Sequence, residues 1–555
     1  MKYALLGFNC RFTHSCLSLF YLRQELVKNM PDADICISQY TINDPYYATL
    51  TQIGTLKAHI YFFSVYIWNE DIITRIIHDL HVLQPLAVFI LGGPQASALA
   101  AEELPANCTI VWGEIEDIDP AFYRDLRHGA LASHYKGGRS ASFASPFIAE
   151  DFNGQLANRH IYYESSRGCP YSCSYCISSI EPGIRNKNLR QVREELKAIQ
   201  DHNPKTIRFV DRTFNASDQR ALAIWKFLTD EPGNTSFHFE ISPDLFTEEM
   251  FSFLESIPPG LFQFEIGIQS THDKTLAAIN RKHRGEASLE NIRRLVKLDT
   301  IHLHIDLILG LPHETFESFG QSFTDVFATC PHYIQMGLLK VLPHTRLSEQ
   351  VKEFSILHCR RPPYEVLSTG WLSHGELTEL FWLGECVEAF YNNRFFRSFF
   401  AFIQKSGQDS FQLFLNLLQA CRKKNFFGRA KTQLLMSEIL LDFTSHASNS
   451  LLMKEILIFD WLRSGHRFLP EHLDPMTSKE LKSRLWLEMP ENFLPFYTNT
   501  SRSNFFKQAI FVEFSGELLK ELGFTDGNDG VLCFLNEREN SVMRLNKVFF
   551  VQGSG

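Results

Sequence analysis

Three closely spaced cysteines are the residues of this chain best suited to chemistry. The segment YYESSRGCPYSCSYCISS holds them as CxxxCxxC, at Cys169, Cys173 and Cys176. Thiolates are the usual ligands of iron–sulfur clusters, and a cubane cluster normally takes four of them. Three protein ligands leave one iron open to an outside ligand, so the spacing predicts a 4Fe-4S cluster with a vacant corner. Three unligated loop thiols or a zinc site are the alternatives, although structural zinc takes four ligands and no CxxC partner follows at the usual spacing.

The cysteine segment directly follows the first of a series of predicted strands. Apolar runs alternate with helical stretches such as 188–201 and 315–329. The six runs are HIYYESS, TIRFVD, SFHFEIS, FQFEIGIQ, LHIDLILG and YIQMGLLKVL. Six such units predict a partial, TIM-like (β/α)6 barrel over residues 160–350. Chemistry in these barrels lies at the carboxyl ends of the strands, and the cysteines fall at such an end.

The N-terminal region shows the same alternation. Five runs, KYALLGF, DICISQY, AHIYFFSV, LAVFILGG and CTIVWGE, are apolar throughout, which is typical of parallel strands buried on both faces. We therefore expect an α/β protein that begins with a Rossmann-like, doubly wound parallel sheet over residues 1–126. Residues 127–159, rich in Ala, Ser and Gly, predict a linker. Residues 351–555 predict a mainly helical C-terminal domain.

The bulk composition limits the partners and the compartment. A chain of 555 residues, 45% apolar and 21% charged, is typical of a globular protein of about three domains. The net charge of −9 disfavours nucleic acid and anionic membranes as partners. The N-terminus MKYALLGFNCRF indicates a strand rather than a signal peptide. We therefore expect a cytoplasmic protein whose remaining cysteines are mostly buried thiols.

The CxxxCxxC segment, with the aromatic Tyr175 before its last cysteine, resembles the signature of radical S-adenosylmethionine (SAM) enzymes. The resemblance implies that SAM chelates the open iron through its amino and carboxylate groups. An electron from the cluster, supplied by an external donor such as flavodoxin or ferredoxin, then cleaves the sulfonium and releases a 5′-deoxyadenosyl radical. Tyr175 is expected either to pack on the adenine or to pack within its own loop.

The ends of the later strands resemble those of HemN-like radical SAM proteins. By that resemblance Glu240 would hold the SAM amino group, and Gln269 and Arg281 would lie near its carboxylate and ribose. Asp306 would contact the ribose or its neighbours. An amine, a carboxylate and hydroxyls do require both an acid and an arginine. Asp211, after the second strand, is expected to face SAM or substrate, or else to cap the next helix.

A Rossmann-like domain before such a barrel resembles the cobalamin-binding radical SAM family. The stretch Thr13-His14-Ser15, the phrase TINDP at 41–45 and the strand end SVYIWN at 64–69 resemble a subgroup of it with a C-terminal domain of unknown function of the DUF4080 type. In that family a serine after one strand and a glycine pair after the next receive the nucleotide tail, since glycine lets the backbone approach closely. The implied cobalamin-binding residues are Ser64, Val65, Tyr66, Gly92, Gly93, Pro94, Gly113 and Glu114. The cobalt-ligating DxHxxG motif is missing, and His14 is expected at a helix start instead. A domain that serves only as a scaffold is the alternative.

These features together predict a cobalamin-dependent radical SAM enzyme, a methyltransferase acting on an unactivated carbon of a small molecule or peptide that the sequence does not identify. A radical SAM rearrangement or ring-forming enzyme is one alternative. A non-catalytic protein that binds SAM or cobalamin for regulation is another. A methylthiotransferase acting on RNA would need a further cysteine cluster, and the scatter of Cys10, Cys16, Cys36 and Cys108 argues against one.

Overall fold

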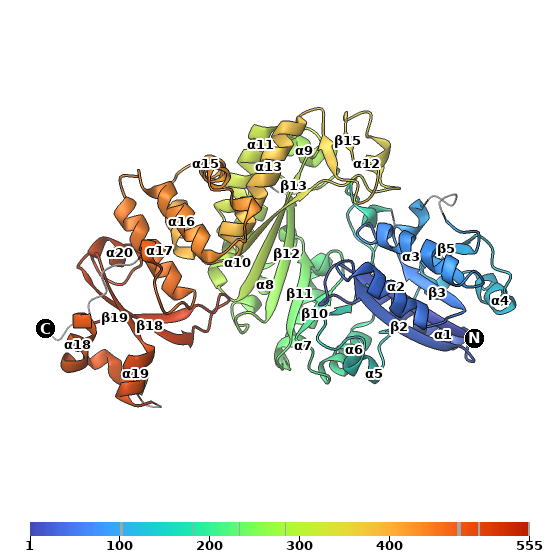
Figure 1. Ribbon diagram of the computed structural model, residues 1–555, viewed down its shortest axis with the longest axis horizontal. Coiled ribbons are helices and arrows are strands. Elements are labelled where there is room, and N and C mark those ends of the chain that lie inside the picture. Colours follow the sequence, from blue (N-terminus) through green and yellow to red (C-terminus); the bar gives the residue numbers. More distant parts are fainter. Residues whose placement is uncertain are drawn as a thin grey trace.

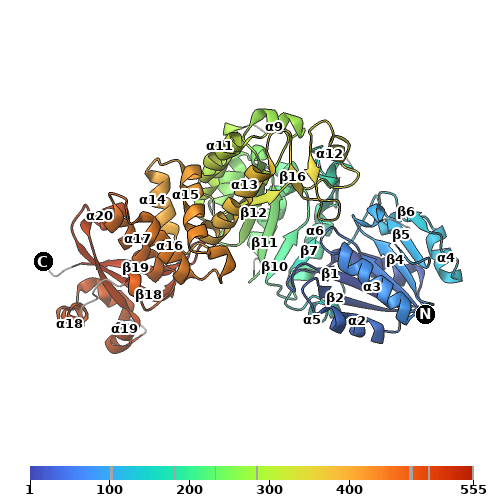
Figure 2. The same cartoon turned by 45° about the horizontal axis from the view of Figure 1, so that its top comes forward.

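The computed structural model describes residues 1–99, 104–180, 183–231, 233–282, 285–473, 479–497 and 500–552. Figures 1 and 2 show an elongated molecule in which an N-terminal α/β part, a central sheet with its helices and a C-terminal part follow one another in chain order. No helix of the described residues is both long enough and apolar enough to cross a membrane.

The N-terminal part is the predicted doubly wound sheet. Its strands pair in parallel in the order β2-β1-β3-β4-β5-β6. Helices α2 and α3 bury Ile53 and Ile77 on one face, and α1 and α4 bury Leu26 and Phe122 on the other. The bounds are β1 (Lys2–Asn9), α1 (Leu17–Asn29), β2 (Asp34–Thr41), α2 (Tyr46–Thr55), β3 (Ile60–Ser64), α3 (Glu70–Leu83), β4 (Val88–Gly92), β5 (Cys108–Trp112), α4 (Ala121–His128) and β6 (His134–Lys136). The order reverses between β1 and β3, and such a switch point opens a crevice at the carboxyl ends of the strands.

The predicted linker contributes structure of its own. Strand β6 lies inside residues 127–159 and pairs with β5, and a short helix, α5 (Ala149–Asn153), follows it. The strand has three residues and only Tyr135 is buried, so it carries too few alternations to be seen as a period in the sequence.

The central part is the second six-stranded parallel sheet, in the order β14-β13-β12-β11-β10-β7. Strands adjacent in the sheet follow one another along the chain, so right-handed crossovers place the intervening helices on one side and the sheet curls into an open, partial barrel. The strands are β7 (Ile161–Tyr163), β10 (Thr206–Phe209), β11 (Ser236–Ile241), β12 (Phe262–Gln269), β13 (Ile301–Leu309) and β14 (Tyr333–Leu338). The helices are α6 (Leu189–Gln200), α7 (Asp218–Asp230), α8 (Glu248–Leu254), α9 (Asp273–Ala278), α10 (Glu286–Leu298) and α11 (Phe316–Phe327).

Side-chain alternation along the strands decides which residues face the inside of the barrel. In β13, Ile301 and Leu303 and every second residue after them are buried, whereas His302, His304 and Asp306 are only half-buried. The apolar face packs under the helices as one core, and the polar face therefore lines the interior of the barrel.

The C-terminal part is mainly helical, as expected. The aromatic residues Phe390, Phe399 and Phe400 are buried and belong to the same core as the barrel. The helices are α12 (Arg346–Glu349), α13 (His374–Cys386), α14 (Arg397–Lys405), α15 (Ser410–Lys423), α16 (Gln433–Thr444), α17 (Ser450–Arg463), α18 (Lys479–Glu488), α19 (Arg502–Gln508) and α20 (Gly516–Glu521). A small hairpin, β15 (Leu357–His358) and β16 (Val366–Ser368), precedes them, and β17 (Ile510–Phe514), β18 (Gly530–Arg538) and β19 (Asn546–Val551) form an antiparallel sheet near the end.

Candidate functional site

The three cysteines lie on a loop between two very short antiparallel strands, β8 (Ser166–Arg167) and β9 (Arg185–Asn186). We call residues 168–184 the cluster loop. All three thiols are free of disulfides; Cys173 is buried and the other two are half-buried. The loop is anchored to the barrel because the Ser174 amide donates to the Ile279 carbonyl and Asn280 Nδ2 donates to the Ser172 carbonyl.

A half-buried arginine faces the central thiol. Arg281 Nη1 lies 3.7 Å from the Sγ atom of Cys173, and its Nη2 donates to the Gly267 carbonyl. Burial raises the pKa of Cys173 and the guanidinium opposes that rise. A cation beside a thiol stabilises the thiolate, which is the form that binds iron. The chemistry of three thiols beside a cation suits a thiolate-held cluster. Their side chains are not gathered in this structure, however, because no three His, Cys, Asp or Glu side chains of the described residues are grouped to hold a metal ion.

Three predicted SAM-binding residues lie at neighbouring strand ends. Gln269 Oε1 and Asp306 Oδ1 are buried and accept no hydrogen bond from the described residues, although His304 Nε2 lies 3.5 Å from Asp306 Oδ1. Burial, and then Glu265 and Glu240, raise the pKa of Asp306 well above its usual value. Burial raises the pKa of Glu240 to about 7, although Arg212 lies 3.8 Å away and opposes the shift. Buried acceptors without donors are expected to find them in a ligand, and a SAM amine with ribose hydroxyls would supply them.

Asp211 does not cap the following helix, and its predicted contact with SAM or substrate stays a prediction. Its Oδ1 accepts from the hydroxyls of Ser165 and Ser166, both at 2.6 Å, and its Oδ2 accepts from the Ser165 amide at 2.9 Å. The following helix, α7, is capped by Ser217 instead. With both oxygens occupied inside the protein, Asp211 holds the chain that enters the cluster loop. Tyr175 is half-buried against the barrel core, and its packing on adenine stays a prediction.

One large cavity lies between the carboxyl ends of the N-terminal sheet and the barrel. Its volume is about 700 Å³, within the range of ligand pockets. Among the predicted cobalamin-binding residues, it is lined by Ser64, Tyr66, Gly92, Gly93, Gly113 and Glu114, whereas Val65 and Pro94 do not line it. Residues that the sequence did not suggest complete it from the barrel side: Tyr162, Glu164, Arg167, Arg185 and Arg212.

The need for glycine at two of these positions comes from the protein backbone. Gly93 has φ +107°, and a Cβ atom there would lie 2.6 Å from the Val65 carbonyl oxygen. Gly113 has φ +88°, and its Cβ would lie 2.3 Å from the Gly137 carbonyl oxygen. At both positions a neighbouring backbone segment already leaves no room for a side chain, whether or not a nucleotide tail binds. Admission of a nucleotide tail is therefore not the only reason for glycine here. At Gly92 a Cβ would make only an ordinary contact, 3.6 Å from the Val111 carbonyl oxygen.

Aromatic and imidazole groups also line the cavity. Tyr66 and Trp68 are stacked, with ring centroids 4.3 Å apart and an interplanar angle of 8°. The turn that carries them is tied to β1 and β3, because Asn69 Nδ2 donates to the Phe8 and Ser64 carbonyls. His14 precedes α1, as expected, but its Nδ1 lies 2.6 Å from the Tyr162 hydroxyl and it lines the cavity.

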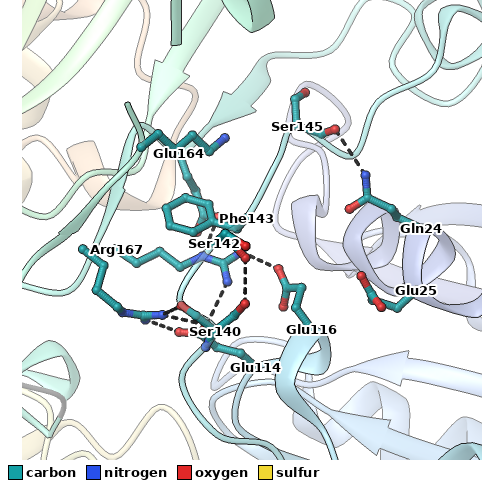
Figure 3. A network of polar contacts seen from close by, with 12 residues as sticks. Gln24, Glu25, Glu114, Glu116, Ser140, Ser142, Phe143, Ser145, Glu164 and Arg167 are labelled. Carbon is teal, nitrogen blue, oxygen red and sulfur yellow. Dashed lines mark hydrogen bonds and ion pairs between the residues drawn. The ribbon is translucent and has the colours of Figure 1, made fainter. Parts of the chain in front are cut away.

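Glu114 is held by two arginines of the barrel side. Arg167 Nη1 and Arg185 Nη1 lie 3.1 and 3.0 Å from Glu114 Oε2, and the Ser140 amide donates to the same oxygen at 2.9 Å. Figure 3 shows this network, with Arg167 also directed at Glu116. Burial works to raise the pKa of Glu114, but the two arginines outweigh it and hold the pKa below its usual value. Glu114 therefore joins the N-terminal part to the central part through ion pairs. Its predicted contact with cobalamin would come in addition to that role.

Comparisons with known proteins relate the chain to radical SAM proteins. The family model described as the radical SAM superfamily matches residues 163–326, and the model described as a protein of unknown function (DUF4080) matches residues 352–532. A 2-(S-pantetheinyl)-carbapenam-3-carboxylate methyltransferase of Streptantibioticus cattleyicolor is 23% identical, over 64% of this chain and 60% of its own length. The cobalamin-dependent radical SAM methyltransferase TokK of Streptomyces tokunonensis is also 23% identical, over 55% of this chain. The chain spans 60% and 50% of these two relatives.

Among solved structures, the cobalamin-dependent SAM radical enzyme OxsB with aqua-cobalamin and SAM bound has the same fold. It matches with a TM-score of 0.56 and 13% identity, over 90% of this chain and 82% of its own. At this identity the likeness concerns the fold.

Proposed function

Because the chain is a radical SAM protein with a DUF4080 C-terminal region, we propose that it is a cobalamin-dependent methyltransferase. It would bind a 4Fe-4S cluster on Cys169, Cys173 and Cys176, SAM at the neighbouring strand ends and cobalamin in the cavity. The observation that carries the proposal is that a single cavity of about 700 Å³ is lined both by the switch-point residues Asn9 and Ser64 and by Gly168 of the cluster loop. The names of the two relatives, both methyltransferases, support methyl transfer.

When bound, the cluster would supply the electron that cleaves SAM, and cobalamin would supply the methyl group. The protein's own residues would bind and orient the cluster, SAM and cobalamin. Arg281 would stabilise the Cys173 thiolate, and Glu240 in its ionised form would pair with the SAM ammonium. Gln269 and Asp306 would accept hydrogen bonds from the ribose hydroxyls. The flat stack of Tyr66 on Trp68 offers a surface for a planar macrocycle at the cavity wall.

The substrate and the electron donor belong to the same proposal. We expect a small molecule or peptide as substrate and an external donor such as flavodoxin or ferredoxin. Free thiols in the cysteine triad suit a reducing compartment, which supports a cytoplasmic location.

Anaerobic reconstitution tests the proposal in two steps. Wild type is expected to bind hydroxocobalamin, seen by its absorbance, and to release 5′-deoxyadenosine from SAM when reduced with dithionite. Cys173→Ala should abolish SAM cleavage, whereas Cys330→Ala, at an exposed cysteine outside the cluster loop, should not. Equal cleavage by wild type and Cys173→Ala would exclude the cluster assignment. A protein that takes up iron and sulfide but never cobalamin would exclude methyl transfer and leave a rearrangement or ring-forming reaction.

A further inference from the structure

The cluster loop has a narrow base formed by two arginines. Arg167 in β8 and Arg185 in β9 are direct partners across the antiparallel pair, and Gly168 and Cys169 follow Arg167 immediately. Like charges opposite one another on paired strands destabilise the pair unless an opposite charge lies between them. The base of this loop therefore depends on an acidic partner.

The acidic partner comes from the other part of the molecule. Glu114 follows β5 of the N-terminal sheet and receives Arg185 through both of its carboxylate oxygens and Arg167 through Oε2. A bidentate arginine–carboxylate pair fixes orientation as well as distance. The three charged groups therefore bind the base of the cluster loop to the edge of the N-terminal sheet.

Arg167 is enclosed by further contacts. Its Nη2 lies 2.8 Å from Glu116 Oε1 and 2.8 Å from Glu164 Oε2. Its guanidinium carbon lies 4.3 Å from the centre of the Phe143 ring. Only 12% of the Arg167 side chain and 14% of the Glu114 side chain are exposed. Buried pairs of this kind are costly to break on one side, because the remaining charge stays buried without a partner.

These charged groups also form part of the cavity wall. Glu114, Arg167 and Arg185 all line it, so a ligand in the cavity meets the residues that hold the cluster loop. We propose that Glu114, Arg167 and Arg185 form a clamp that positions the cluster loop against the cavity, so that a bound cobalamin and an ordered cluster loop stabilise each other. The inference rests on the proposed function for the identity of the ligand. By thermodynamic linkage, if cobalamin favours the ordered cluster loop, then the ordered cluster loop raises the affinity for cobalamin by the same factor.

A second ion pair in the same region provides a matched control. Arg23 of α1 forms a two-fold pair with Asp151 of α5, at 2.5 and 2.6 Å, and the exposed side-chain fractions are 14% and 6%. It joins the N-terminal sheet to the segment before the barrel with similar burial, but neither residue lines the cavity. If loss of the clamp acted only by lowering the stability of the protein, Arg23→Met would have the same effect.

The test is hydrogen–deuterium exchange of the anaerobically reconstituted protein, read on peptides covering residues 166–180, with and without hydroxocobalamin. In wild type, hydroxocobalamin should slow exchange of these peptides. Arg185→Met should speed exchange about tenfold and abolish the response to hydroxocobalamin, because the loop then opens locally. Arg185→Lys, which keeps the charge but not the bidentate geometry, should recover part of the response. Arg23→Met should keep the whole response.

Retention of the full response in Arg185→Met, or its equal loss in Arg23→Met, would overturn the clamp. If Arg185→Met does not fold, Glu114→Gln removes the charge without changing the shape and should give the same result. If wild type binds no hydroxocobalamin, the proposed cofactor fails, and the clamp is judged by exchange in the ligand-free protein. Equal exchange of wild type and Arg185→Met would then overturn it.

Discussion

The guanidinium of Arg281 lies 3.7 Å from the Cys173 thiol, in a half-buried position between the cluster loop and the end of β12. The two residues come from segments 108 positions apart, and the contact places a permanent positive charge beside one of the three thiols that would hold the cluster as thiolates. A cluster held by thiolates is negatively charged, and a neighbouring cation offsets the cost of burying that charge.

Replacement of Arg281 should weaken the cluster. We expect Arg281→Met to bind less iron and sulfide after reconstitution and to cleave SAM about tenfold more slowly or worse, since loss of a partner to a metal ligand typically costs 10–100-fold. Iron and sulfide content and the electron paramagnetic resonance spectrum of the reduced protein measure the effect. Arg293→Met, on the outer side of α10 where the arginine pairs with Glu286, is the control and should behave as wild type.

Binding of SAM should depend on pH through Glu240. Its pKa is raised to about 7 in the ligand-free protein, so near pH 6 the carboxyl is mostly protonated and cannot pair with an ammonium. SAM affinity should therefore rise from pH 6 to pH 8 in wild type and change much less in Glu240→Gln. Isothermal titration of the reconstituted, unreduced protein with SAM checks this. An equal pH dependence in both proteins would contradict the assignment of Glu240 to the amine.

Stability above neutral pH should depend on Glu314. The Oε1 atom of this fully buried carboxyl accepts from the Ser270 hydroxyl, and burial raises its pKa to about 8. Between about pH 4.5 and about pH 8 this carboxyl is protonated in the folded protein but ionised in the unfolded chain. The free energy of unfolding therefore falls as the pH rises through this window. Glu314→Gln should lose less stability than wild type between pH 6 and pH 9, by on the order of a few kcal/mol. Denaturant unfolding at the two pH values measures the difference, and parallel losses would refute it.

Neighbouring glycines of the cavity wall should respond differently to alanine. Gly93→Ala combines a left-handed backbone with a Cβ atom 2.6 Å from the Val65 carbonyl oxygen, and should cost about 2–4 kcal/mol of unfolding free energy. Gly92→Ala meets only an ordinary contact and should cost less than about 1 kcal/mol. Thermal unfolding distinguishes them. Similar losses for both variants would show that the backbone crossing at Gly93 relaxes.

Local pattern was enough to predict most of the architecture. The apolar runs at Lys2–Asn9 and Ile301–Leu309 are long, and their strands form where the residues indicate. Strands β6 and β19 were not expected. Strand β6 has only three residues, and most side chains of β19 are half-buried, so neither strand shows a clear alternation of apolar and polar residues. The same argument applies to the cysteines: the spacing of Cys169, Cys173 and Cys176 is local, so it is visible without a structure.

The partners of the charged residues were not predictable in this way. Glu114 was expected to contact cobalamin and Asp211 to contact SAM or cap a helix, but each is bound by residues far away in the chain. Arg185 is 71 positions from Glu114, and Ser165 is 46 positions from Asp211. Ion pairs and hydrogen bonds act over a few ångströms in space, and a single sequence contains no record of which distant segments will meet.

By itself, the sequence of this protein determined the alternation of strands and helices, the two parallel sheets and the three thiols at a strand end, because each follows from residues close together in the chain. Only the tertiary structure decided that the two sheets share one cavity, that Arg281 faces Cys173 and that Glu114 joins the sheets through two arginines. The physical reason is that hydrophobic burial and local periodicity specify elements, whereas the charges of a site take their partners from the way those elements pack.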